Sequence, residues 1–164
     1  MRESSQMQVE SLKTGACALD QLRAVTCALL PLAAIQARIV GADDQRLWME
    51  APLAANLNDK GSAFGGSMTS LMTYSGWALV ALQLRQAGVR ADVFVADSSV
   101  RYLKPLYADL RAEARLAPGQ SWEIFLATLA QRGRARIHVR ARMTLPEGDV
   151  MADLAGRYVA IANG

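Results

Sequence analysis

Residues 61–84 read GSAFGGSMTSLMTYSGWALVALQL and contain no charged side chain. The apolar residues of this segment do not keep to one face of a helix, whereas a helix at a protein surface shows a polar stripe. The segment also contains too many Ser and Thr residues for a transmembrane span. We therefore expect a buried helix that is surrounded by protein on most sides. Gly88 follows it, where a left-handed residue commonly ends a helix.

The chain after Gly88 alternates apolar and polar residues, as β-strands do. Five runs show this period, separated by turns that contain Pro or Gly: 93–103, 110–116, 122–130, 134–145 and 151–162. The fourth run is the clearest, because alanine and larger apolar residues take one face while arginines, His138 and Thr144 take the other. Such alternation is typical of an antiparallel strand with one face on a core and one in water.

The segments before the buried helix predict a helix and a hairpin. Leucines and Val25 recur at three- and four-residue spacing from Leu12 to Pro31, which predicts an amphipathic helix that ends at the proline. Residues 33–40 and 46–51 alternate on either side of a turn, which predicts a β-hairpin. Residues 1–11 are polar and without a period, so we expect a flexible N-terminus followed by one domain over 12–164.

These elements together favour an α+β fold, in which a strongly curved antiparallel sheet wraps one long central helix and the N-terminal helix packs outside. Such a sheet has open edges. We therefore expect two subunits to pair edge to edge.

Composition and charge exclude several classes of protein. The net charge is +3, with six basic and seven acidic residues over 1–80 but twelve and eight over 81–164; fifteen of the eighteen basic residues are arginine. Aromatic residues do not interleave with the arginines, which disfavours nucleic-acid binding. Cys17 and Cys27 are too few for a disulfide framework or a metal site, which favours a reduced, cytoplasmic setting. Acidic residues upstream of the apolar segment 24–35 argue against a cleaved signal.

Gly65 and Gly66 directly precede the buried helix. Glycines let a ligand approach the backbone closely, and the free N–H groups of a first helical turn favour partial negative charge. A thioester carbonyl or a phosphate would suit such a site equally well. The alternative is a close-packed turn without a ligand.

Several linked motifs resemble the YiiD C-terminal type of thioesterase, a branch of the hotdog-fold superfamily, over about residues 31–162. They are Ala51-Pro52-Leu53, Asn56-x-Asn58, Lys60-Gly61, Phe64-Gly65-Gly66-Ser67, Gly76-Trp77, Ala96-Asp97-Ser98 and Arg101-Tyr102-Leu103-Lys104-Pro105. The resemblance implies a hotdog homodimer, which could pair into a tetramer. It further implies hydrolysis of acyl-CoA or acyl carrier protein thioesters at a site between subunits, without a metal or a bound cofactor.

The sequence departs from the common hotdog pattern in two places. Many hotdog thioesterases carry His-Gly-Gly before the helix and an acidic residue nine positions after that His, where this chain has Phe64 and Thr73. Our hypothesis is that Gly66 stabilises the oxyanion, Asn58 and Thr73 hold the water, and Asp97 is the base. Asp97 could instead form a structural ion pair. The resemblance and the motifs give the expected substrate-binding residues as Asn56, Phe64, Gly65, Ser67, Tyr74, Arg101 and Lys104.

Two other functions and two uses of the arginines stay open. The missing His and helix carboxylate favour a non-catalytic acyl-CoA or acyl carrier protein binding protein. A dehydratase is disfavoured, because His138, the single histidine, lies on the charged face of its strand. The arginine face over 132–142 could pair with Glu113 and Glu123, or bind coenzyme A phosphates or an acidic carrier protein.

Overall fold

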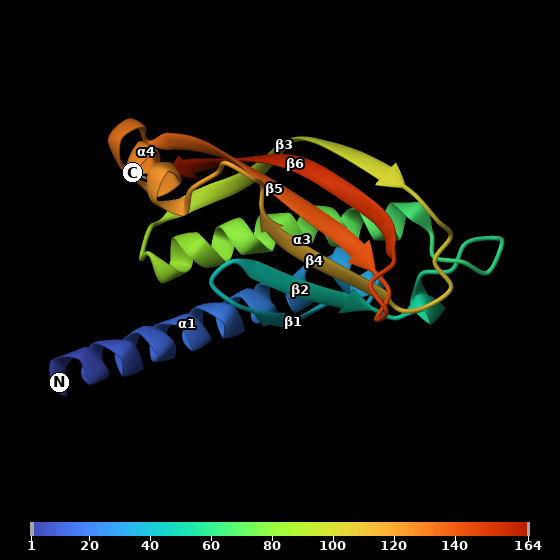
Figure 1. Ribbon diagram of the computed structural model, residues 1–164, viewed down its shortest axis with the longest axis horizontal. Helices are drawn as coiled ribbons and strands as arrows, with labels where there is room; N and C mark the ends of the chain where they lie inside the picture. Colours follow the sequence, from blue (N-terminus) through green and yellow to red (C-terminus); the bar gives the residue numbers. More distant parts are fainter. Residues whose placement is uncertain (1, 164) are drawn as a thin grey trace.

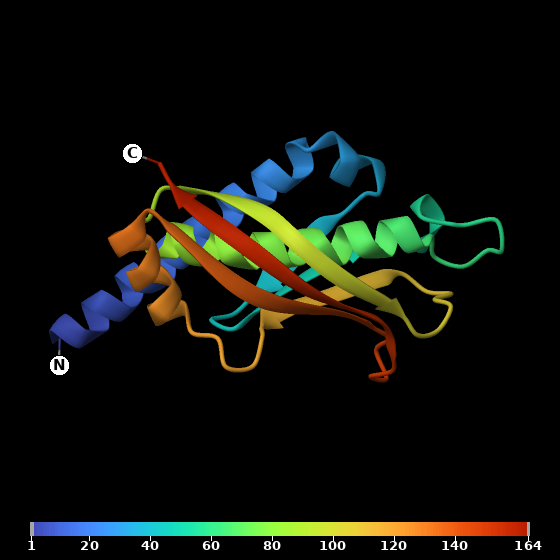
Figure 2. The same cartoon turned by 90° about the horizontal axis from the view of Figure 1, so that it is seen from above.

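The computed structural model describes the backbone of residues 2–163 and the side chains of residues 15–163. One antiparallel sheet contains six strands in the order β1-β2-β4-β5-β6-β3 (Figure 1). The strands are β1 (Arg38–Ala42), β2 (Arg46–Ala51), β3 (Ala91–Tyr102), β4 (Leu110–Leu116), β5 (Arg134–Thr144) and β6 (Val150–Ala162). The sheet curves around the long helix α3 (Gly65–Gln86), as both views show (Figure 2). The expected α+β architecture is therefore confirmed.

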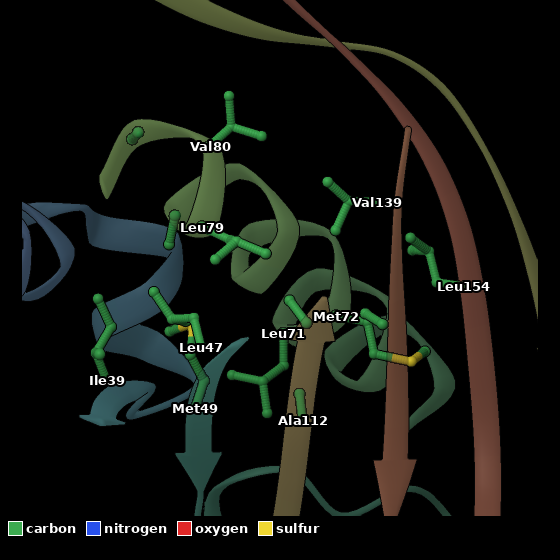
Figure 3. Close-up of a cluster of buried hydrophobic side chains, with 14 of the residues drawn as sticks. Ile39, Leu47, Met49, Leu71, Met72, Leu79, Val80, Ala112, Val139 and Leu154 are labelled. Atoms are coloured by element: carbon green, nitrogen blue, oxygen red, sulfur yellow. The ribbon is translucent and has the colours of Figure 1, made fainter. Parts of the chain in front are cut away.

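Helix α3 is buried because β2, β3, β4, β5 and β6 cover one side of it and helix α1 covers another. Its fully buried residues Leu71, Met72 and Leu79 pack among apolar side chains of the sheet (Figure 3). The helix ends at Gln86, and Gly88 follows with φ of +67°, the left-handed conformation that the sequence predicts. We call the sheet face toward α3 the inner face and the opposite one the outer face.

Helix α1 (Arg2–Ala28) begins ten residues before the start that the leucine spacing predicts. Leu22 is fully buried in the core, and the Thr26 hydroxyl lies 3.1 Å from that of Tyr74 on α3. Pro31 lies in the first turn of a second short helix, α2 (Leu30–Ala34), where proline is well tolerated. The flexibility expected of residues 1–11 stays a prediction, and Met1 lies outside the described residues. Within residues 2–163, no helix combines the length and apolar character that crossing a bilayer requires.

The prediction of a strand over residues 122–130 is wrong, because this segment forms helix α4 (Trp122–Arg132). The Ser121 hydroxyl accepts a hydrogen bond from the backbone N–H of Ile124, which caps the start of the helix, and Gly133 ends it with φ of +67°. Phe125 and Leu129 are buried four residues apart, on the side that packs against β5 and β6. Helical caps and a four-residue period therefore prevail over the alternation.

Strand β3 lies at the edge of the sheet, paired only with β6 among the described strands. Its register fixes which side chains share a face. Val100 opposes Leu154, which is buried in the core, and so lies on the inner face. Tyr102 shares this face, since successive side chains alternate. Arg101 and Asp97 lie on the outer face, opposite Asp153 and Arg157.

Candidate functional site

The first turn of α3 has no side-chain cap. The Phe64 carbonyl oxygen accepts a hydrogen bond from the N–H of Met68, 3.1 Å away. Among the described residues, the N–H groups of Gly65, Gly66 and Ser67 have no acceptor. Since the first amides of a helix lack intrahelical partners, these three donors are available to a ligand oxygen.

Two aromatic rings flank the glycine pair. A Cβ atom on Gly66 would lie 2.3 Å from the Phe64 ring, and one on Gly65 would lie 3.3 Å from the Tyr102 ring. Both rings are more than half exposed. Glycine is therefore required at position 66 if the Phe64 ring keeps its place, and the free amides lie beside two exposed aromatic rings.

The Tyr102 hydroxyl connects β3 to the start of α3. It donates a hydrogen bond to the Gly65 carbonyl oxygen, 3.0 Å away, and it also bonds the Thr69 hydroxyl. Because a phenol has one proton, Thr69 must be the donor in the second bond. The sequence motif contained Tyr102 but gave it no role. Alternation along β3 places Tyr102 on the same face as Val100, but the sequence does not show that this face points toward α3.

A stripe along α3 is only partly covered. We define the α3 stripe as Gly66, Thr69, Ser70, Thr73 and Trp77, which recur at helical spacing and are exposed or half-buried. The predicted site residues Gly66 and Thr73 therefore lie on one line, roughly 10 Å apart along the axis by the helical rise. A groove of about 950 Å³ lies at the far end of the stripe, lined by Trp77, Arg85, Arg90 and Phe94 among others.

The two asparagines hold the loop before α3. The side-chain amide of Asn56 donates to the carbonyl oxygens of Ile35 and Pro52, at 2.9 and 2.8 Å, and its backbone carbonyl accepts from the N–H of Phe64 at 2.7 Å. Asn58 bonds Lys60 and Ser62 through its side chain, at 2.8 to 3.1 Å. Both residues thus fix the position of Phe64 and the glycines from behind.

The structure does not bring Asp97 together with the glycine turn. Asp97 lies on the outer face of β3 and is paired with Arg157, while Gly65 lies against the inner face. The ion pair that the sequence left open for Asp97 is therefore present.

Arg101 and Lys104 also have carboxylate partners. Arg101 forms a two-bond ion pair with Asp153 on the outer face, and its guanidinium holds the pKa of that carboxyl below its usual value. Lys104 lies 3.5 Å from Asp149.

Tyr74 and Ser67 are less accessible than expected of substrate-binding residues. Tyr74 stacks on Trp77 with ring centroids 5.0 Å apart and faces Thr26 of α1, and burial raises the pKa of its hydroxyl. Ser67 is buried. The α3 stripe between Gly66 and Trp77 contains hydroxyl, amide and aromatic groups but no carboxylate or imidazole.

The comparisons with known proteins agree with this geometry. A family model described as "Putative thioesterase (yiiD_Cterm)" matches residues 19–162. The chain belongs to this family. The glycine turn, both asparagines and Tyr102 all fall within the match.

Solved structures of similar proteins confirm the hotdog fold of this thioesterase-family chain. A protein of unknown function from Chlorobaculum tepidum has a TM-score of 0.84 and 24% identity, over 92% of this chain and 98% of that one. A protein from Shewanella oneidensis, described as a "putative thioesterase", has a TM-score of 0.77 and 28% identity, over 88% and 97%. A thioesterase from Haemophilus influenzae has a TM-score of 0.68 and 13% identity, over 88% and 90%.

Proposed function

We propose that this chain is a hydrolase of acyl thioesters carried by coenzyme A or an acyl carrier protein. The uncapped first turn of α3, between the rings of Phe64 and Tyr102, is the observation that carries the proposal. A thioester carbonyl oxygen bound there would accept hydrogen bonds from the free amides of Gly66 and its neighbours. These bonds strengthen as the oxygen gains negative charge, which lowers the barrier to attack.

Water attacks the carbonyl carbon, the C–S bond breaks, and the products are a carboxylic acid and a thiol. In this proposal the Thr73 hydroxyl holds the water, while Asn58 acts indirectly by fixing the loop that carries Phe64. The thiol that leaves has an ordinary pKa of about 8.5, so it can depart as the thiolate without a strong acid beside it. This property suits a site whose stripe offers no imidazole or carboxylate.

The site would be completed by a second copy of the chain. β3 offers twelve residues of open edge, and Phe94, Val95, Tyr102 and Leu103 are exposed along it and directly after it. β3 starts near the C-terminal end of α3 and finishes beside Gly65. Antiparallel pairing of two β3 strands would therefore set each glycine turn beside the partner's groove at Trp77 and Arg85, which gives a homodimer.

We also place this one-domain protein in the cytoplasm, where its two exposed cysteines would stay reduced.

Thiol release from short, long and aromatic acyl-CoAs tests the proposal. We expect hydrolysis of at least one substrate, reduced at least about tenfold by Gly66→Ala, because the new methyl group displaces the Phe64 ring over the free amides. Gly41→Ala is the matched control, since its Cβ would meet only an ordinary contact at 3.7 Å.

A non-catalytic acyl-CoA binding protein is the second candidate, favoured by the missing carboxylate and imidazole. Saturable binding without thiol release would establish it.

A further inference from the structure

Three arginines lie side by side across the outer face of the sheet. Arg46 on β2 opposes Arg115 on β4, and Arg115 opposes Arg140 on β5. Like charges directly opposite each other destabilise a sheet. Asp43 pairs with Arg46, but within the described part of the chain no carboxylate lies within 4.0 Å of Arg115 or Arg140. The arrangement therefore does not serve the folding of the chain.

Neighbouring positions extend the same charge. Arg136 and Arg142 lie on the same face of β5 as Arg140 and are likewise exposed and without an ion pair among the described residues. We define the arginine patch as Arg115, Arg136, Arg140 and Arg142. It spans one interstrand spacing and six residues of strand, or about 5 by 20 Å.

Glu113 and Asp153 lie directly opposite Arg142 in the sheet, and Arg142 and Arg140 help to lower the pKa of Asp153 after the larger effect of Arg101, but the hydrogen-bond partners of both acids lie outside the patch. Glu113 accepts a hydrogen bond from the Trp48 indole N–H at 2.9 Å and lies 4.0 Å from Arg46, and Asp153 binds Arg101. Glu123 is exposed on α4 and forms no ion pair with any of the residues that the structure describes. The sequence left open that the arginine face over 132–142 pairs with Glu113 and Glu123; among the described residues, no ion pair within 4.0 Å joins them, and Glu113 lies near Arg46 instead.

The patch fits a protein surface that carries several carboxylates. Arginine forks bind carboxylates through two parallel bonds, and a surface of this length exceeds what one phosphate covers. A nucleic acid is disfavoured because no Phe, Tyr or Trp lies between these arginines on β5, where the exposed His138 is the one intervening ring, and because the net charge is only +3. A second copy of the chain is disfavoured because it would oppose arginine to arginine.

We infer that the arginine patch docks the acidic surface of an acyl carrier protein, so that carrier-bound thioesters are the preferred substrates. This inference rests on the proposed hydrolysis. The row through Arg140 continues to Ala155 and Ser99, three residues before Tyr102. The patch lies on the outer face, with β6 between its strand β5 and the edge strand β3, and its Arg140 row is about 10 Å along the strands from the level of the glycine turn. A carrier protein docked there would therefore have to reach the turn around the end of the sheet with the flexible arm that carries its acyl group.

The experiment compares one acyl group on two carriers. The variant is Arg115→Ser/Arg140→Ser, and Arg38→Ser/Lys60→Ser is the control with the same loss of charge at exposed positions outside the patch. We expect kcat/KM for the acyl carrier protein to fall about tenfold or more through KM, with kcat/KM for acyl-CoA within twofold of wild type. Raising the salt concentration should lower the wild-type kcat/KM for the carrier-bound substrate toward that of the variant. The control should have the same kcat/KM as wild type.

Three results would overturn the inference. The first is an equal loss of kcat/KM for acyl-CoA and for the carrier-bound substrate, which would indicate phosphate binding. The second is no loss of kcat/KM for either substrate. The third is a variant that loses affinity only for a single-stranded oligonucleotide. Calorimetric titration with the carrier protein separates this inference from the proposed function. If wild type hydrolyses nothing but binds the carrier more than tenfold tighter than the variant does, the hydrolysis proposal fails and the docking surface stands. Equal binding by both proteins refutes the docking surface.

Discussion

The Tyr158 hydroxyl on β6 donates a hydrogen bond to the Thr73 carbonyl oxygen on α3, 2.8 Å away, with the tyrosine side chain fully buried. The ring fits because two glycines lie against it. A Cβ atom on Gly76 would lie 2.2 Å from the hydroxyl oxygen, and one on Gly156 would lie 2.8 Å from the ring. Tyr158 therefore sets how closely α3 approaches the sheet, and with it the position of the α3 stripe.

Gly76→Ala should lower the free energy of unfolding by about 1–3 kcal/mol, because the enclosed Tyr158 ring has no room to move. The cost exceeds the gain of up to about 1 kcal/mol that alanine brings to a helix interior. Urea denaturation measures the difference. Gly15→Ala in α1 is the matched control: its Cβ would meet only Gln86 at 3.6 Å, and its stability should be unchanged or raised. Adding Tyr158→Phe to Gly76→Ala should restore part of the loss. If Gly76→Ala were as stable as wild type, α3 could shift away from β6 at no cost, and Tyr158 would not set the distance between them.

Tyr102→Phe should reduce the rate of thiol release about three- to tenfold while the melting temperature stays near that of wild type. The variant keeps the ring beside Gly65 but loses the bonds to the Gly65 carbonyl and to Thr69, which together fix the first turn of α3. Tyr107→Phe is the control, since Tyr107 is 65% exposed. An unchanged rate in Tyr102→Phe would mean that the hydroxyl does not position the free amides.

Thr73→Val and Asp97→Asn should differ in their effect on hydrolysis. Thr73 lies on the α3 stripe, so removing its hydroxyl should lower kcat at least about tenfold if it holds the water. Asp97 lies on the outer face with Arg157, so Asp97→Asn should leave kcat and KM within twofold of wild type. A large loss in Asp97→Asn would return the carboxylate to the mechanism as the base.

Asp153→Asn should destabilise the fold at neutral pH and lose this effect in acid. Arg101 lowers the pKa of the Asp153 carboxyl below the ordinary value of 3.8. A carboxyl whose pKa is lower in the folded chain contributes stability above the unfolded value and loses it as the pH falls through the folded one. The free energies of unfolding of wild type and Asp153→Asn should therefore differ at pH 6, and the difference should shrink as the pH falls below 3.8 and through the lowered pKa of the folded chain. A constant difference across this range would show that the ion pair contributes nothing.

The sequence was sufficient for most of the fold because the strongest periods in it have a single interpretation. A helix without charged residues must be covered by the rest of the protein, here by the sheet. The alternation in 134–145 belongs to a strand with one buried and one solvent-exposed face. Residues 122–130 carry both periods at once, since Trp122, Ile124 and Leu126 alternate while Trp122, Phe125 and Leu129 follow a helix. The caps at Ser121 and Gly133 decide between them.

The site was harder to predict because it depends on which face of β3 meets α3. Asp97 and Tyr102 are five residues apart, which places them on opposite faces of an ordinary strand, but nothing local says which face is inner. The strand also has an irregularity between Val95 and Asp97 that shifts its register. The glycine turn was predictable because Gly-Gly before a helix needs no knowledge of the sheet.

Because the start of α3 is uncapped, the protein without a ligand is expected to be less stable than the protein with one bound there. A molecule that offers an oxygen to the three idle amides adds bonds that only the folded chain can form, so its binding raises the melting temperature with the logarithm of its concentration. Heating the protein with a library of acids, esters and thiols would then rank ligands before any turnover is known.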